Sequence, residues 1–171
     1  AGGDTIFRGA GAAGVTNMGR INAVGGDVFL LGKTVVNTGA ISAANGTVGL
    51  AAGEEVLITA VANPAGERGV VRATAGAGGG PGVDNSGAIE GAMVELKAHG
   101  NMYALAINNS GSIRATGATN NGGKVTLRAI GGTITNTGSI AATIPNGSGG
   151  RIIMDAGVGG TVNAGGTIDA S

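Results

Sequence analysis

A short phrase that recurs along most of the chain constrains its fold more than any other feature. The phrase is an apolar residue followed by x-Asn-x-Gly-x-Ile, and its copies occupy residues 15–21, 35–41, 83–89, 107–113 and 134–140. Self-similarity at a spacing of roughly 20 to 50 residues marks a repeat architecture, in which neighbouring units stack and share one core. We therefore expect each copy of the phrase to occupy the same place in a repeated structural unit.

A second recurring element, close to Gly-x-Val-x-Leu-x-Ala, follows each copy of the phrase. It occupies residues 26–31, 46–52, 92–98, 123–129 and 150–156, and the chain opens on a related segment at residues 3–8. Its apolar residues alternate with period two, which predicts strands, whereas no segment sustains the apolar spacing of a helix. The sequence therefore predicts an all-β fold in which the following pairs point to one side: Val28/Leu30, Val48/Leu50, Val94/Leu96, Val125/Leu127 and Ile152/Met154.

The isoleucine positions of the phrase set the expected length of the repeat. They fall at 21, 41, 89, 113, 140 and, in a related segment, 168, so the steps are 20, 48, 24, 27 and 28 residues. Such steps suit a parallel β-helix (β-solenoid), whose turns stack at a strand spacing of about 4.8 Å. The step of 48 suggests two turns, with a hidden one that contains residues 55–60 and 69–73. We expect about 6–7 coils of 20–28 residues, with insertions in glycine-rich corners at residues 74–81 and 116–123.

Stacking would give each position of the phrase a physical role. The isoleucines would form one core column, and the asparagines would form a ladder in which each side-chain amide bonds to the next, as in cross-β assemblies. Asparagine and glycine also suit a corner with positive φ. Aligning residues 161–168 without gaps puts Ala164 in the asparagine column, where we expect the ladder to end or slip. The predicted ladder is Asn17, Asn37, Asn85, Asn109 and Asn136, and the predicted core column is Ile21, Ile41, Ile89, Ile113, Ile140 and Ile168.

Composition narrows the classes of function. The chain has 38 glycines, three aromatic residues and no cysteine, yet 42% of its residues are hydrophobic; this favours a thin body with an aliphatic core over disorder. Ten basic and ten acidic residues cancel without clustering, so no stripe exists to bind nucleic acid. No run of 18 apolar residues predicts a membrane span. The absence of cysteine excludes disulfides and cysteine-based metal sites.

Motifs that could carry chemistry are weak in this sequence. Residues 9–14 match G-x-G-x-x-G, but the next segment predicts a bend and a strand where a dinucleotide site needs a helix. Residues 26–34 have one residue too many for a phosphate-binding loop. His99 is the only histidine, so no histidine pair can hold a metal, and a solvated bend is the expected setting for it.

Acidic residues also form no expected cluster. Asp4 and Asp27 share a register, but the following repeats carry other residues at that position, namely Thr47, Met93, Lys124 and Arg151. A β-helix lyase or glycosidase would gather carboxylates on one face. The segments Glu54-Glu55 and Glu67-Arg68 are expected to be solvated bends. We predict no catalytic, cofactor-binding or metal-binding residue and no enzymatic activity.

Several phrases together resemble filamentous haemagglutinin-type exoproteins of Gram-negative bacteria. The resemblance lies in residues 26–31, 36–41, 45–53, 103–108 and 166–171 and covers most of the chain from residue 15 onward. It implies a right-handed parallel β-helix that acts as an adhesin or extended stalk. It also implies an extracellular or cell-surface location and export by two-partner secretion, with an outer-membrane secretion partner. The secretion-signal segment typical of the family is not recognisable, so residues 1–171 are expected to be one interior β-solenoid segment of a longer protein or a filament unit.

The expected function is therefore structural and adhesive: a non-catalytic rod or filament segment. Its partners would be neighbouring coils, or copies of the same protein in end-to-end or filament contacts, and a surface glycan or a host or cell receptor. The outward apolar residues Ile6, Phe29 and Ile153 are candidates for lateral contacts. The alternative is a carbohydrate-active or carbohydrate-binding β-helix module, which would require carboxylates gathered on one face.

Overall fold

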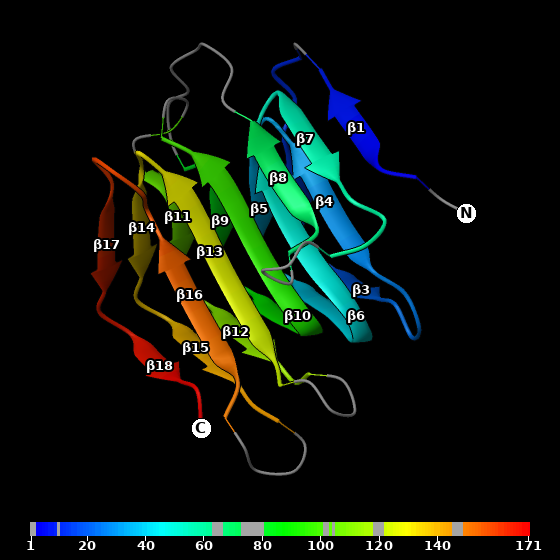
Figure 1. The fold of residues 1–171 in the computed structure, drawn as a ribbon, viewed down its shortest axis with the longest axis vertical. Coiled ribbons are helices and arrows are strands. Elements are labelled where there is room, and N and C mark those ends of the chain that lie inside the picture. Colours follow the sequence, from blue (N-terminus) through cyan, green and yellow to red (C-terminus); the bar gives the residue numbers. More distant parts are fainter. Residues whose placement is uncertain are drawn as a thin grey trace.

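The computed structural model describes residues 3–9, 11–62, 67–72, 81–100, 103, 105–117, 122–144 and 149–171. Over these residues the chain forms β-strands joined by short turns, and no helix occurs among them (Figure 1). The predicted all-β fold is confirmed, and most strand pairs are parallel. The expected insertion corners at residues 74–81 and 116–123 lie largely outside the described residues.

One wall of the molecule is a six-stranded parallel sheet in the order β17-β14-β11-β9-β5-β2. Each strand except β17 carries the first half of the Asn phrase, and the strands pair in register so that like residues are neighbours. The strands are β2 (Val15–Asn17), β5 (Val35–Asn37), β9 (Val83–Asn85), β11 (Leu105–Asn109), β14 (Thr133–Asn136) and β17 (Thr161–Ala164).

The second sheet is branched, because its two longest strands, β6 (Ala40–Ala52) and β10 (Ala88–His99), each take part in two rows of strands. In what we call the short arm, their first halves pair with each other and lie in the row β3 (Arg20–Asn22), β6, β10, β12 (Ser112–Ala115), β15 (Ser139–Ala142) and β18 (Thr167–Asp169). In the long arm, their second halves lie in the row β4 (Val28–Gly32), β6, β10, β13 (Lys124–Ile130) and β16 (Arg151–Asp155).

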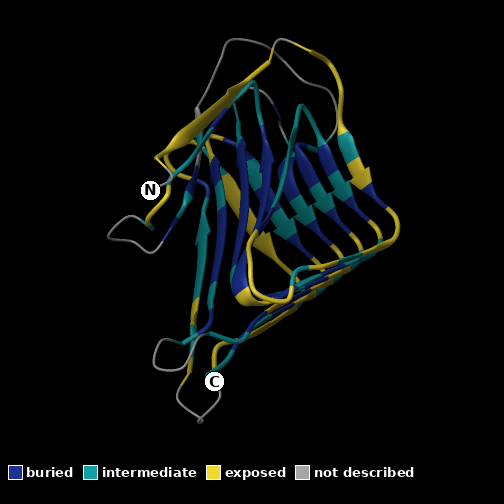
Figure 2. Cartoon of the chain, turned by 90° about the vertical axis from the view of Figure 1, so that its right-hand side faces the viewer, coloured by how far each residue is buried: buried dark blue, intermediate teal, exposed yellow. Residues whose placement is uncertain are grey.

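A narrow aliphatic core lies between the six-stranded sheet and the two arms. Figure 2 shows the buried residues on strands that lie one behind another, with exposed residues at the corners. The isoleucines at 21, 41, 89, 113, 140 and 168 are register neighbours in the short arm. In the long arm, Val48, Leu50, Val94, Leu96, Val125 and Leu127 are fully buried. Period-two alternation therefore identified the core side of these strands correctly.

A third, antiparallel sheet lies outside this stack and corrects two predictions. It consists of β1 (Thr5–Arg8), β7 (Glu55–Ile58) and β8 (Gly69–Arg72) in the order β1-β7-β8. The hidden turn expected at residues 55–60 and 69–73 is wrong, because Ile41 pairs directly with Ile89 and leaves no space for a turn between them. Segment 3–8 is likewise no repeat strand, so Asp4 does not share a register with Asp27.

The glycine of the repeated phrase is required by close stacking of the backbone. A Cβ atom on Gly39, Gly87, Gly111, Gly138 or Gly166 would lie 2.0–2.1 Å from the carbonyl oxygen of the same glycine one repeat earlier. The predicted positive φ at this corner is wrong, because the positive-φ residues described are Gly117, Gly131, Gly157 and Gly159. Glycine occupies this column because any side chain would collide with the neighbouring backbone, which cannot move aside.

The column provides a matched test of this explanation. Gly111→Ala should destabilise the fold by about 1–3 kcal/mol or more, because its Cβ would lie 2.1 Å from the Gly87 carbonyl oxygen. Gly19→Ala places the same change at the same phrase position, but its Cβ would meet nothing within 4 Å. Denaturant unfolding of both variants measures the difference, and equal stability losses would contradict the stacking explanation.

Candidate functional site

The structure brings the five predicted asparagines together in one column. Their side-chain amides form a continuous chain in which each Nδ2 donates to the Oδ1 of the next asparagine, at 2.8, 2.7, 2.7 and 2.6 Å. Asn37, Asn85, Asn109 and Asn136 are fully buried. Ala164 is the register neighbour of Asn136, so the chain of amides ends there, at the position that the sequence alignment predicted.

This geometry gives the asparagines a structural role. Asn37, Asn85 and Asn109 each accept one hydrogen bond from the previous repeat and donate one to the next. The amides of Asn37, Asn85 and Asn136 also donate to the carbonyl oxygen two residues ahead at 3.4 Å. A buried amide without partners would cost about 1–3 kcal/mol, so the ladder allows a polar residue to stay inside the core. A ligand could reach these atoms only by breaking the ladder.

Asn109→Leu should therefore destabilise the fold by about 1–3 kcal/mol for each amide left without a partner, since Asn85 Nδ2 and Asn136 Oδ1 both bond to Asn109. Asn163→Leu is the control, because Asn163 is exposed and lies outside the column. Thermal unfolding monitored by circular dichroism compares the two, and an unchanged midpoint for Asn109→Leu would rule out a stabilising ladder.

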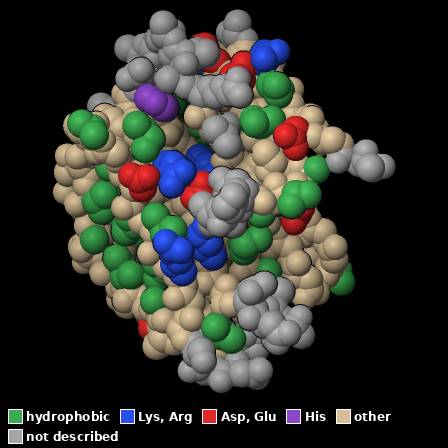
Figure 3. Space-filling view, in the orientation of Figure 1, with side chains coloured by type: hydrophobic (Ala, Val, Ile, Leu, Met, Phe, Trp, Pro, Cys, Tyr) green, Lys and Arg blue, Asp and Glu red, His purple; other side chains and the backbone are tan. Residues whose placement is uncertain are grey.

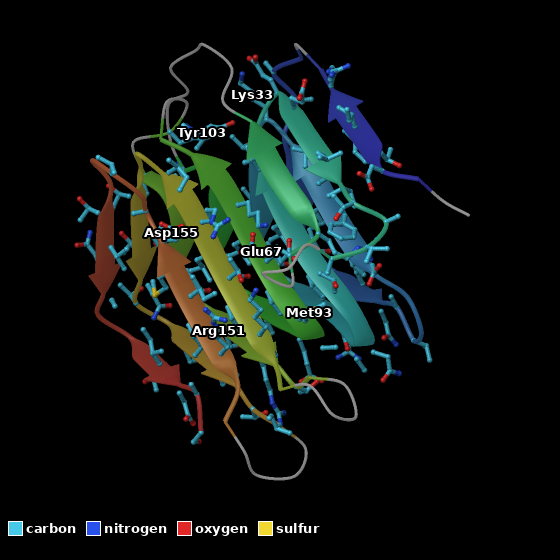
Figure 4. The ribbon with its side chains drawn as sticks, in the orientation of Figure 1. Lys33, Glu67, Met93, Tyr103, Arg151 and Asp155 are labelled. Carbon is cyan, nitrogen blue, oxygen red and sulfur yellow. The ribbon has the colours of Figure 1, made fainter. Side chains whose placement is uncertain are left out.

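A cluster of charged side chains occupies the outer face of the long arm, where sequence analysis expected no site. Basic and acidic groups gather at the centre of this face (Figure 3), and Figure 4 places Glu67 above the arm and Asp155 on β16. Three members are almost completely buried: Glu67 is 2% exposed, Glu95 3% and Lys97 3%. We call Glu67, Glu95, Lys97, Arg128 and Asp155 the outer charged cluster.

The cluster attaches β8 and the residues before it to the long arm. Glu95 accepts hydrogen bonds from the backbone N–H groups of Arg68 at 2.7 Å and Gly69 at 2.9 Å. Lys97 Nζ donates to the Gly69 carbonyl oxygen and lies 3.2 Å from Glu67 and 3.3 Å from Glu95. Because these groups are buried, displacing β8 would leave charges without partners, so the cluster fixes where β8 packs on the sheet.

Arg128 extends the cluster toward β16. Its Nη1 donates to Glu67 at 3.0 Å, and its Nε lies 3.2 Å from the carboxylate of Asp155. The Arg128–Asp155 contact is an ion pair, and Arg128 Nε makes no hydrogen bond to any described residue. The cluster therefore spans strands β10, β13 and β16 as well as Glu67, which precedes β8.

The prediction that Glu54-Glu55 and Glu67-Arg68 are solvated bends is wrong for Glu55, Glu67 and Arg68, whereas Glu54 does lie in a bend and is partly exposed. Glu67 is buried in the cluster, and Arg68 pairs with Asp27 while its guanidinium lies 5.5 Å from the centroid of the Phe29 ring. Glu54 pairs with Lys33, and Glu55 pairs with Arg8 at 2.6 Å. The signal that could have revealed the cluster is the alternation of Glu95 and Lys97 with buried Val94 and Leu96, which places both charges together on one outer face.

Lys124 lies on the same arm but takes no part in the ion pairs. Its Nζ is buried without a hydrogen-bond partner among the described residues. Burial lowers the pKa of this amine, and Arg151, its neighbour in the register, lowers the pKa further, while Glu67 and Glu95 act in the opposite direction. The amine of Lys97 therefore forms ion pairs with two carboxylates, whereas the amine of Lys124 has no hydrogen-bond partner among the described residues.

Lys97→Met should destabilise the fold by about 3–5 kcal/mol, because it leaves Glu67 and Glu95 buried next to each other without their shared cation. Lys124→Met removes an amine that has no partner and should leave stability unchanged or raise it slightly. Guanidinium denaturation of the two variants tests this contrast. Equal losses would show that the cluster contributes only packing.

A groove of about 480 Å³ runs across the outer face of the short arm. Its floor is made of small residues such as Ala40, Ala88 and Ser112, and its charged groups are Arg20, Glu90 and Arg114. Glu90 and Arg114 lie 3.7 Å apart and remain about half exposed. Glu90 is the single carboxylate that lines the groove, so the pair of carboxylates that glycoside hydrolysis requires is not present there.

No group of three or more His, Cys, Asp or Glu side chains suited to a metal ion occurs among the described residues. His99 ends β10 and is half-buried. The described part of the chain contains no helix that could cross a membrane. The sequence matches no protein-family model, and searches of curated proteins and of solved structures return no match.

Proposed function

We propose that the chain is a segment of a right-handed parallel β-helix with six coils, one for each isoleucine of the core column. In this proposal the six-stranded sheet, the short arm and the long arm are the three faces of the coil. The antiparallel sheet of β1, β7 and β8 is an insertion that lies outside it. In-register pairing of like residues between successive strands supports this reading.

We further propose that this segment serves as a structural, adhesive part of an extracellular rod or filament and carries no catalysis. The observation that carries the proposal is the stacking of identical residues in the asparagine and glycine columns. Each repeat makes the same contacts with the next, so length can grow by adding repeats without a new core. A protein built in this way is suited to bridging distance.

The resemblance to filamentous haemagglutinin-type exoproteins supplies the proposed location and partners. It supports a place at the surface of a Gram-negative bacterium, export through an outer-membrane secretion partner, and contact with a glycan or cell receptor. One feature of the structure supports the extended-stalk part of this proposal: the buried asparagine amides join successive repeats.

Carbohydrate binding is a second candidate, favoured by one observation. The groove on the short arm combines the hydroxyl groups of Ser42, Ser112 and Ser139 with the charges of Arg20, Glu90 and Arg114. These groups suit hydrogen bonding to a polar, extended ligand without cleavage of it. Such binding is compatible with an adhesive rod, whereas cleavage would require a second carboxylate.

Electron microscopy of the native particle, with antibodies against this chain, tests the proposed function. We expect labelled fibres or rods on the cell surface or shed from it, and removal of the outer-membrane secretion partner should abolish the surface label. A matched strain that lacks this chain controls for antibody specificity. Labelling confined to the cell interior, or to compact particles, would contradict the proposal.

A further inference from the structure

Strand β1 presents an exposed edge that the stack of parallel strands does not use. It pairs on one side with β7, while its other side forms the right-hand border of the molecule in Figure 1, and no described strand pairs with that side. Ile6 and Phe7 are 44% and 47% exposed. Unpaired strand edges with apolar side chains are ready-made sites for another strand.

The hydrogen bonds of β1 show which backbone groups are available. Gly9 donates its N–H to the Glu54 carbonyl oxygen at 3.0 Å, so Gly9 faces β7. In an antiparallel pair alternate residues direct both backbone groups to the same side, so Phe7 and Thr5 also face β7. Asp4, Ile6 and Arg8 therefore direct their backbone N–H and C=O groups away from the molecule.

This pattern restricts how two copies of β1 can pair. Antiparallel pairing across a two-fold axis must match outward-facing residues with one another. An axis through Ile6 pairs Ile6 with its own copy and sets Asp4 opposite Arg8 of the second copy, on both sides of the axis. Arg8 contacts Glu55 through Nε, so the terminal amino groups of its guanidinium can meet the carboxylate of Asp4 in the second copy.

We propose that β1 is an edge-strand contact through which two copies of this chain associate, with the two-fold axis at Ile6. The edge strand supplies backbone hydrogen bonds, Ile6 supplies apolar contact, and the Asp4–Arg8 pairs fix the register. In Figure 1, β1 lies at the border beyond β4, so this contact lies near the end of the stack that begins with β2, β3 and β4. The contact is small relative to stable dimer interfaces, so the association is weak and reversible.

Of the three outward apolar residues that the sequence suggested for lateral contacts, the structure singles out Ile6. Phe29 lies beneath the guanidinium of Arg68, and Ile153 is half-buried. All three lie on strands with one edge that no described strand pairs, but Ile6 is the exposed one among them, at 44%.

Sedimentation of the full chain over a range of concentrations, compared with its Ile6→Pro variant, tests the proposal. The Ile6 N–H points outward, so proline removes a hydrogen bond of the dimer and none between β1 and β7. We expect the wild type to show a dimer that grows with concentration and Ile6→Pro to stay monomeric with the same melting temperature. A strictly monomeric wild type, or a variant that associates as strongly as the wild type, would overturn the proposal.

Charge reversal and cross-linking test the register. Asp4→Arg should weaken association about five- to tenfold, because it sets like charges opposite each other on both sides of the axis. The chain has no cysteine, so Ile6→Cys introduces a single thiol. A short bis-maleimide should link this variant into dimers about tenfold faster than Val24→Cys, whose side chain is more exposed. Equal cross-linking rates, or unchanged association of Asp4→Arg, would refute the axis at Ile6.

Discussion

The close approach of successive repeats is the constraint on which the rest of this structure depends. At the corner of the repeated phrase, the backbone of one glycine lies so near the next that no Cβ atom fits between them. Backbone hydrogen bonds between stacked strands set the stacking distance, and glycine permits that distance at this corner. The stacking distance puts each asparagine amide 2.6–2.8 Å from the next and aligns the isoleucines of the short arm. One spacing thus places a polar ladder and an apolar column side by side.

A narrow core explains why so few large side chains are needed. Val, Ile, Leu and Ala from the three walls fill the interior, and Tyr103 is the one aromatic side chain among its buried members. The Tyr103 hydroxyl donates to the Lys33 carbonyl oxygen, and burial, together with the charge of Glu54, raises the pKa of the phenol. The outer face of the long arm adds a second layer, in which buried ion pairs hold the insertion. Charges thus fix the insertion to the stack, whereas hydrogen-bonded amides and aliphatic contacts hold the stack itself.

Much of the stack could be predicted because the repeated phrase encodes it locally. Asn37, Asn85 and Asn109 are recognisable from their neighbours alone, and period-two alternation identified the buried side of β6, β10 and β13. The insertion could not be predicted in this way, because Val56 and Leu57 form strand pairs with segments on both sides and their alternation resembles that of a repeat strand. Alternation along β10 could have placed Glu95 and Lys97 on one outer face, but not Glu67. Glu67 reaches Lys97 and Arg128 only after the chain folds back over β10, and no spacing in the sequence records that path.

The central claim is that Asn37 and Asn85, 48 residues apart in sequence, are neighbours in one ladder. Nuclear Overhauser contacts between side-chain amide protons, measured with ¹⁵N-labelled asparagine, test it most directly. The account predicts contacts from the Asn37 amide to the Asn17 and Asn85 amides, with slow hydrogen exchange at Asn37, Asn85 and Asn109. Contacts from Asn37 to residues 55–72 in place of Asn85, or rapid exchange of these amides, would contradict it.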